Sequence, residues 1–191
     1  MARPRRLIPP ALFATGALCF LLPFASVSCQ GPAATNEGLG PGRATQTGFQ
    51  MATGTGPTLE MHPGVLETLG EDRRILERDP EPLAAMAFAS GLLGIAMSVG
   101  TGRLWRVASA ALAVAAVAVL VMLRAELQSD LTAFGRLLGF EPAEMDEVFV
   151  LQYRAGYWLA LTAFASAVLS VAAPLLLRPW AAASSRRRSS A

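Results

Sequence analysis

The sequence has few of the side chains that catalytic and metal sites need. It contains no lysine, one histidine (His62), two cysteines and only 16% charged residues in 191. One histidine is too few for a histidine-based metal site, and it leaves His62 as the one base available to a Ser-His-Asp arrangement. No CxxC pair, phosphate-binding loop or glycine-rich dinucleotide motif is present. We therefore expect a protein that is not an enzyme, with no catalytic, cofactor-binding or metal-ligating residues and no cofactor.

The two cysteines, Cys19 and Cys29, are too few for a disulfide framework. In a helix their spacing corresponds to about 15 Å, whereas a disulfide joins Cα atoms within about 7 Å. The segment ending at Cys29 resembles a lipoprotein signal, but its apolar run over residues 7–27 exceeds the usual length of about 7–15 residues. Ser26 also stands where such signals usually carry leucine. We expect Cys29 to be a thiol just outside the membrane; lipidation of Cys29 and cleavage of the first apolar segment are the alternatives.

Long apolar segments dominate the rest of the chain, which is 53% hydrophobic with a mean hydropathy of +0.43. A membrane-spanning helix needs about 17–25 largely apolar residues. Four segments meet this length: residues 7–27, 82–102, 105–124 (charge-free over 107–123) and 155–177. Buried helices of a soluble protein are the alternative, but they seldom run this long without a charge. The sequence therefore predicts a mainly α-helical fold, a bundle of four transmembrane helices forming one domain over residues 1–191.

The arginines predict the orientation of this bundle. Nine arginines and no acidic residue lie in residues 1–6, in the 103–106 turn and in the tail 178–191. Six of the other seven arginines and all fourteen acidic residues lie in the two loops, 28–81 and 125–154, and the seventh, Arg124, directly precedes the second loop. Because cytoplasmic segments carry the excess of arginine, both termini are expected in the cytoplasm and both loops outside.

Small residues recur at helical spacing inside the apolar segments. No charged residue lies in 7–27, 82–102, 107–123 or 155–177. The absence of charge argues against a proton-coupled transporter or an intramembrane protease built from one chain. Small residues let helix backbones approach closely, so we expect a compact bundle, with a homodimer through one stripe as an alternative. The stripes are Ala87, Ser90, Gly91, Gly94 and Ser98; Ala108, Ala111, Ala115 and Ala118; and Gly156, Ala160, Ala163, Ala167 and Ser170.

Two prolines stand near the ends of apolar segments. Pro23 lies near the end of the first and Pro174 near the end of the fourth. Proline removes a helical hydrogen bond, so each is expected to kink or end its helix.

The first outer loop carries two patterns of local structure. Residues 46–52 alternate apolar and polar side chains next to glycines, which favours a short strand. The second half of the loop, over 64–81, favours an amphipathic helix. Its apolar side is formed by Val65, Leu66, Leu69, Ile75 and Leu76.

The second outer loop carries a matching pair of patterns. Apolar residues at Leu127, Leu131, Phe134 and Leu138 predict that the third helix continues past the membrane. Residues 148–153, VFVLQY, favour a strand. Because a lone strand leaves its backbone unpaired, we expect 148–153 to pair with 46–52, so that the two loops form one extracytoplasmic cap.

Three groups of polar residues are candidates for a site, but we expect each of them to lie at the surface in contact with water. Glu60 and His62 would need further ligands to bind a metal. The acidic residues Glu141, Glu144, Asp146 and Glu147 suit an outer loop without any cation. The arginine-rich tail is expected to orient the chain; phosphorylation or binding to acidic lipid head groups is the alternative.

Three short motifs carry a resemblance to a group of small bacterial membrane proteins with four spans. They are SVSCQG at 26–31, TGFQMATG at 47–54 and YRAGYWLAL at 153–161. The resemblance implies this topology and no known activity, so it assigns no site residue.

These features together predict a non-enzymatic, multi-pass protein of the cell membrane that acts through its outer loops. Its surroundings are the lipid bilayer, its expected partner is another membrane or envelope protein, and no nucleic acid is expected. The alternative is an oligomeric channel or an accessory subunit of a transporter.

Overall fold

The computed structural model describes residues 8–29, 42–60, 79–100, 102–137 and 149–188. The helices are α1 (Ile8–Cys19), α3 (Gly48–Thr53), α5 (Pro82–Ser98), α6 (Arg103–Leu137) and α8 (Ala155–Arg188). The strands are β1 (Pro23–Cys29), β2 (Arg43–Thr47), β3 (Thr58–Glu60) and β4 (Phe149–Tyr153). The chain is therefore mainly helical with a small antiparallel sheet, as predicted.

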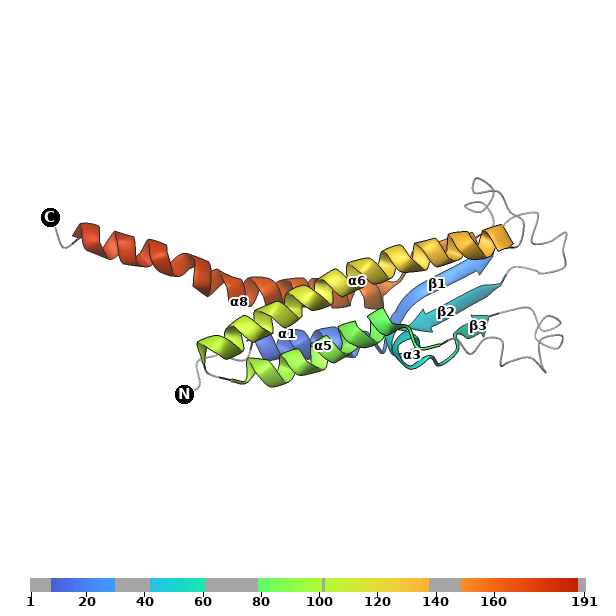
Figure 1. The fold of residues 1–191 in the computed structure, drawn as a ribbon, viewed down its shortest axis with the longest axis horizontal. Coiled ribbons are helices and arrows are strands. Elements are labelled where there is room, and N and C mark those ends of the chain that lie inside the picture. The colour runs from blue at the N-terminus through green and yellow to red at the C-terminus, as the bar shows by residue number, and fades with distance from the viewer. Residues whose placement is uncertain (1–7, 30–41, 61–78, 101, 138–148, 189–191) are drawn as a thin grey trace.

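Four helices lie side by side and form an elongated bundle (Figure 1). α1 packs against α5 and α8, and α6 packs against the same two helices, so the four form a closed ring. The sheet continues from one end of this bundle, while α1 begins and α8 ends toward the other (Figure 1).

Two helices contain a stretch that is long and apolar enough to cross a membrane, Arg103–Ala133 of α6 and Ala155–Ala173 of α8. Only 28% and 39% of their most apolar parts are buried within the molecule. α1 and α5 are apolar as well but shorter, with 12 and 17 residues. The structure thus supports two of the predicted spans by length and composition, and the count of four stays a prediction.

The first predicted helix is shorter than expected. The sequence predicts one helix over 7–27, but α1 ends at Cys19 and residues 23–29 form β1. Three successive bonds of the tighter i to i−3 type close the helix, the last from the Leu22 N–H to the Cys19 carbonyl at 3.0 Å. Pro23 then has no N–H to continue the helix. The expectation that Pro23 ends it is confirmed.

Phenylalanine rings fill the centre of the bundle and lie against glycine backbone. Phe13 and Phe164 are fully buried, with ring centroids 6.1 Å apart. A Cβ on Gly16 would stand 2.7 Å from the Phe164 ring, one on Gly91 would stand 3.1 Å from it, and one on Gly94 would overlap Phe13. These glycines let the helices approach closely enough for the rings to fill the space between them.

The small-residue stripes are confirmed on α8, confirmed in part on α5 and wrong on the third helix. On α8 the predicted stripe is buried from Gly156 to Ala167. On α5 Ala87, Gly91 and Gly94 are buried, whereas Ser90 and Ser98 are only half-buried. On α6, however, Ala111, Ala115 and Ala118 are exposed. This helix instead buries Ser109, Ala113, Ala116, Val119, Leu120 and Leu123. Alanine occurs on every side of α6, so spacing alone cannot select the face that packs.

The sheet has the order β3-β2-β1-β4, and its neighbouring strands are antiparallel. β1 lies between β2 and β4, so that Ala25 stands opposite Gln46 on one side and Tyr153 on the other. The predicted strand over 148–153 is confirmed as β4, but its predicted pairing with 46–52 is wrong. β4 pairs with β1, and β2 pairs with the opposite edge of β1.

The predicted strand 46–52 is itself divided between two elements. Thr47 ends β2 and caps α3: its hydroxyl accepts from the Gln50 N–H at 3.1 Å, and the Gln50 side chain accepts from the Thr47 N–H at 2.8 Å. This reciprocal capping box starts a helix. Gly54, with a φ of 73°, ends it in the left-handed conformation that glycine adopts readily.

The remaining local predictions divide into three groups. α6 continues to Leu137 and includes Leu127, Leu131 and Phe134, which confirms the extension of the third helix. α8 continues through Pro174 to Arg188, so this proline does not end it. The predicted helix in 64–81 falls largely outside the described residues, as do Leu138, His62 and the acidic residues at 141–147.

Candidate functional site at the junction of bundle and sheet

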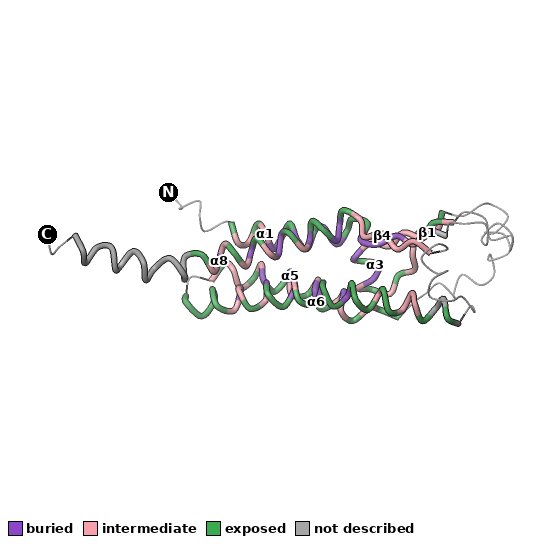
Figure 2. The backbone as a smooth tube through the Cα atoms, turned by 90° about the horizontal axis from the view of Figure 1, so that it is seen from above, coloured by how far each residue is buried: buried purple, intermediate pink, exposed green. Residues whose placement is uncertain are grey.

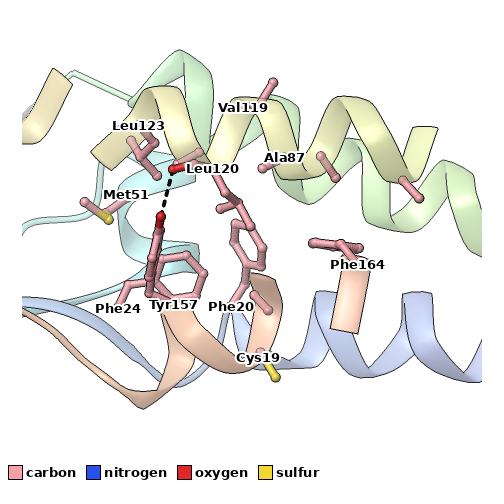
Figure 3. Close-up of a cluster of buried hydrophobic side chains, with 14 of the residues drawn as sticks. Cys19, Phe20, Phe24, Met51, Ala87, Val119, Leu120, Leu123, Tyr157 and Phe164 are labelled. Carbon is pink, nitrogen blue, oxygen red and sulfur yellow. Dashed lines mark hydrogen bonds between the residues drawn. The ribbon is translucent and has the colours of Figure 1, made fainter. Parts of the chain in front are cut away.

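The three sequence motifs meet where the helices join the sheet, a region we call the junction. It comprises Phe20, the part of β1 around Ser26, the start of α3, Arg124 of α6, and residues 153–158. Figure 3 shows Phe20, Phe24 and Tyr157 gathered there, next to Met51 and Leu120. Phe24 lies 4.7 Å from Phe20 and 6.0 Å from Tyr157, measured between ring centroids.

Two glycines from separate motifs make this packing possible. A Cβ on Gly48 would stand 2.8 Å from the Phe20 ring and 2.9 Å from the Phe24 ring. A Cβ on Gly156 would stand 2.7 Å from the Pro23 carbonyl oxygen and 2.9 Å from that of Leu22. Gly156 therefore lets the start of α8 lie directly on the backbone that leads into β1.

Backbone hydrogen bonds join the sheet and α3 to the ends of the helices that lie next to them. The Phe49 N–H donates to the Phe20 carbonyl, and the Arg154 N–H donates to the Phe24 carbonyl, each at 2.8 Å. The Glu81 N–H, just before α5, donates to the Met51 carbonyl at the same distance. Buried backbone bonds of this kind are costly to break, so the sheet, α3 and the helix ends form one unit.

A buried polar pair joins β1 to the start of α8. The Arg154 Nε donates to the Ser26 Oγ at 2.7 Å, and Ser26 is 2% exposed. A hydroxyl buried to this degree needs a hydrogen-bonding partner, and Arg154 supplies one with a charged donor. The sequence analysis missed this pair because the two residues lie 128 positions apart.

A second arginine, Arg124, lies over two aromatic rings. Its guanidinium carbon is 5.1 Å from the centroid of the Tyr153 ring and 5.7 Å from that of Trp158. The Tyr153 hydroxyl donates to the Arg124 carbonyl at 3.0 Å, and the Tyr157 hydroxyl donates to the Leu120 carbonyl at 3.3 Å, one turn earlier on α6. Burial raises the pKa of the Tyr153 phenol, and the positive charge of Arg124 partly offsets this effect.

The residues singled out from the sequence do not gather into a catalytic or metal site. Cys29 ends β1, and its Cα pairs with that of Phe149 on β4. Cys19 is a buried free thiol, and Glu60 is exposed at the end of β3. Within residues that the structure describes, no group of three or more His, Cys, Asp or Glu side chains could hold a metal ion.

Comparison with known proteins adds no family. The chain matches no protein-family model and no curated protein. The function must therefore be argued from the bundle and the junction alone.

Proposed function

We propose that this chain is a four-span protein of the cell membrane whose extracytoplasmic cap binds another membrane or envelope protein. The cap comprises β1–β4, α3 and the outer part of α6. The chain performs no catalysis, both termini lie in the cytoplasm, and the junction holds the cap in a fixed position on the bundle.

The observation that carries this proposal is the apolar outer surface of the bundle. Large hydrophobic side chains are exposed on all four long helices, at Ile8, Leu18, Met86, Leu92, Leu93, Leu104, Val107, Val114, Val121, Met122, Leu159 and Leu169 among others. Figure 2 colours residues along the outer sides of the bundle as exposed. Exposed large hydrophobic side chains on every helix of a bundle favour aggregation in water and are stable against lipid.

The shortest of these helices, α1, is extended across the bilayer by β1 in the proposed arrangement. β1 follows the C-terminal end of α1 and continues along the long axis of the molecule (Figure 1). At about 1.5 Å per helical residue and 3.3 Å per strand residue, α1 and the first half of β1 extend about 30 Å, close to the thickness of the hydrocarbon core. β1 is paired on both sides, which satisfies its backbone where it enters the membrane.

Charged residues mark the two ends of this apolar surface. Arg103 and Arg106 stand at the turn between α5 and α6, whereas Glu81, Arg124 and Arg154 stand at the junction. Residues 107–123 and 155–177 between them carry no charge. The arginine excess at the 103–106 end favours the cytoplasm for that end.

Photo-crosslinking in intact cells tests the cap as a binding surface. A photoreactive phenylalanine analogue replaces Phe49, whose side chain is 42% exposed on α3, and separately replaces Gln152 on β4. We expect both positions to give an adduct of the same mass, and we expect none from the matched control Leu104 at the opposite end. A variant of Arg154 that loosens the junction should weaken the adduct. Absence of any adduct from both cap positions would contradict the proposal.

The alternative of a channel requires an assembly of several chains. Phe13, Phe164 and Phe20 fill the interior of the bundle and are fully buried, so they leave no path through a single copy. Solute flux through reconstituted vesicles, abolished by substitutions on the exposed Ala111 and Ala115 face, would favour this alternative over the proposed cap function.

A further inference from the structure

Arg124 stands at the point where the apolar surface of α6 ends. Val121 and Met122, less than one turn earlier, are 53% and 60% exposed, and the residues from 107 to 123 are uncharged. Arg124 is the first charged side chain after this stretch, and it is exposed. In the proposed orientation it lies at the outer boundary of the hydrocarbon core, from where its long side chain can reach the lipid head groups.

The guanidinium is held in place by neighbouring aromatic side chains. It lies over the rings of Tyr153 and Trp158, with its central carbon 5.1 Å and 5.7 Å from the ring centroids. The Tyr153 hydroxyl bonds back to the Arg124 carbonyl, so the ring is fixed to the same turn of α6. An arginine oriented in advance in this way loses less conformational entropy when it binds a ligand.

The site opens toward lipid rather than toward the interior of the bundle. Trp158 and its neighbour Leu159 on α8 are 45% and 49% exposed. The Arg124 guanidinium lies over the Tyr153 and Trp158 rings, and Arg124 is itself exposed beside them. Glu126, two positions later, projects to another side of the helix because each residue turns the helix by about 100°.

From this geometry we propose that Arg124, Tyr153 and Trp158 form a binding site for the phosphate group of an anionic phospholipid in the outer leaflet. The planar guanidinium offers two parallel N–H donors to two phosphate oxygens. A guanidinium that lies over an aromatic ring keeps its N–H donors at its edge, where they can reach a phosphate. The exposed apolar residues Val121, Met122 and Leu159 contact the acyl chains below the head group.

The inference rests on the proposed membrane topology, and the test separates the two. The full-length protein is incorporated into nanodiscs of phosphatidylcholine containing a minor fraction of phosphatidylglycerol. Incorporation itself reports on the membrane proposal. Native mass spectrometry of the released protein then reports which lipid stays bound, and an arm with inorganic phosphate in place of phosphatidylglycerol distinguishes a lipid site from a site for free anions.

We expect the wild-type protein to retain phosphatidylglycerol in preference to phosphatidylcholine. Arg124→Gln, which keeps the length and helical propensity of the side chain, should lower this preference roughly tenfold, the effect of losing one charge-assisted hydrogen-bonded pair. Arg124→Lys should lower it less, because a lysine keeps the charge but loses the bidentate geometry. The matched control is Arg103→Gln, an exposed arginine at the opposite end of α6.

Three results would overturn the inference while leaving the membrane proposal intact. The first is normal incorporation of Arg124→Gln with an unchanged lipid preference. The second is an equal loss of preference in Arg103→Gln, which would indicate general attraction to arginine. The third is displacement of the lipid by inorganic phosphate. If Arg124→Gln incorporates poorly, Trp158→Leu, which keeps the arginine and removes one stacking ring, should show a reduced preference; an unchanged preference there would also overturn it.

Discussion

Gly156 leaves no room for a side chain where α8 begins, and replacing it with alanine tests the junction directly. The added Cβ would stand 2.7 Å and 2.9 Å from the carbonyl oxygens of Pro23 and Leu22. Both are backbone atoms, and contacts under 3.0 Å essentially never occur for a real Cβ, so β1 and α8 must separate. Overpacking of this kind costs about 1–3 kcal/mol. Alanine recovers less than about 1 kcal/mol as the better helix former.

We therefore expect Gly156→Ala to lower the free energy of unfolding by about 1–2 kcal/mol. Equilibrium unfolding in mixed detergent micelles, followed by tryptophan fluorescence, measures this change. Hydrogen exchange supplies a local measurement: the Arg154 amide donates to the Phe24 carbonyl beside Gly156, so it should exchange faster in the variant.

Gly102→Ala is the control, because Gly102 is exposed and its nearest backbone atom is 4.0 Å from an added Cβ. The Trp105 side chain, 3.2 Å away, can adjust. A Gly156→Ala protein that is as stable as Gly102→Ala, with an unchanged Arg154 exchange rate, would refute the close contact of α8 with the backbone before β1.

Three further predictions concern α3, Tyr153 and the cysteines. Gly54→Ala should lower the free energy of unfolding by about 1–2 kcal/mol, because an L-residue is strained at its φ of 73°; Gly54→Asn should cost less in the same unfolding assay. Burial raises the pKa of Tyr153 in the folded state, so its contribution to stability is complete below about pH 10 and is lost as the pH rises through the folded pKa. Absorbance titration of a Tyr157→Phe protein, which leaves Tyr153 as the only tyrosine, should give a higher pKa folded than unfolded, and equal values would contradict this. A membrane-impermeant maleimide applied to intact cells should label Cys29 and not Cys19, which is 6% exposed; labelling only after the inner face is opened would reverse the topology.

The first apolar segment illustrates what composition alone cannot distinguish. Residues 7–27 are uniformly apolar, and such a run fits a buried helix or a buried strand equally well. Pro23 indicated where the helix ends, but it did not indicate that a strand follows. β1 forms because β2 and β4 supply hydrogen bonds on both of its sides, and β4 lies more than a hundred residues away in the chain.

Local signals were sufficient where the decisive atoms are close in sequence. The extension of α6 follows from the spacing of Leu127, Leu131 and Phe134, and the strand at β4 follows from its β-branched and aromatic residues. The helix α3 also had a local signal, the Thr47–Gln50 capping box, which the alternation of polar and apolar residues obscured. A search for the cap before the strand pattern would have found it.

By itself, the sequence determined the properties that add up along the chain. The lack of charge in four segments, the separation of arginines from acidic residues and the scarcity of catalytic side chains are all visible without a fold. Only the tertiary structure decided which face of α6 is buried, which strands pair, that Ser26 accepts from Arg154, and that Arg124 lies over two rings. The physical reason is that these features depend on contacts between distant residues, and several arrangements satisfy the same local pattern until the whole core is packed.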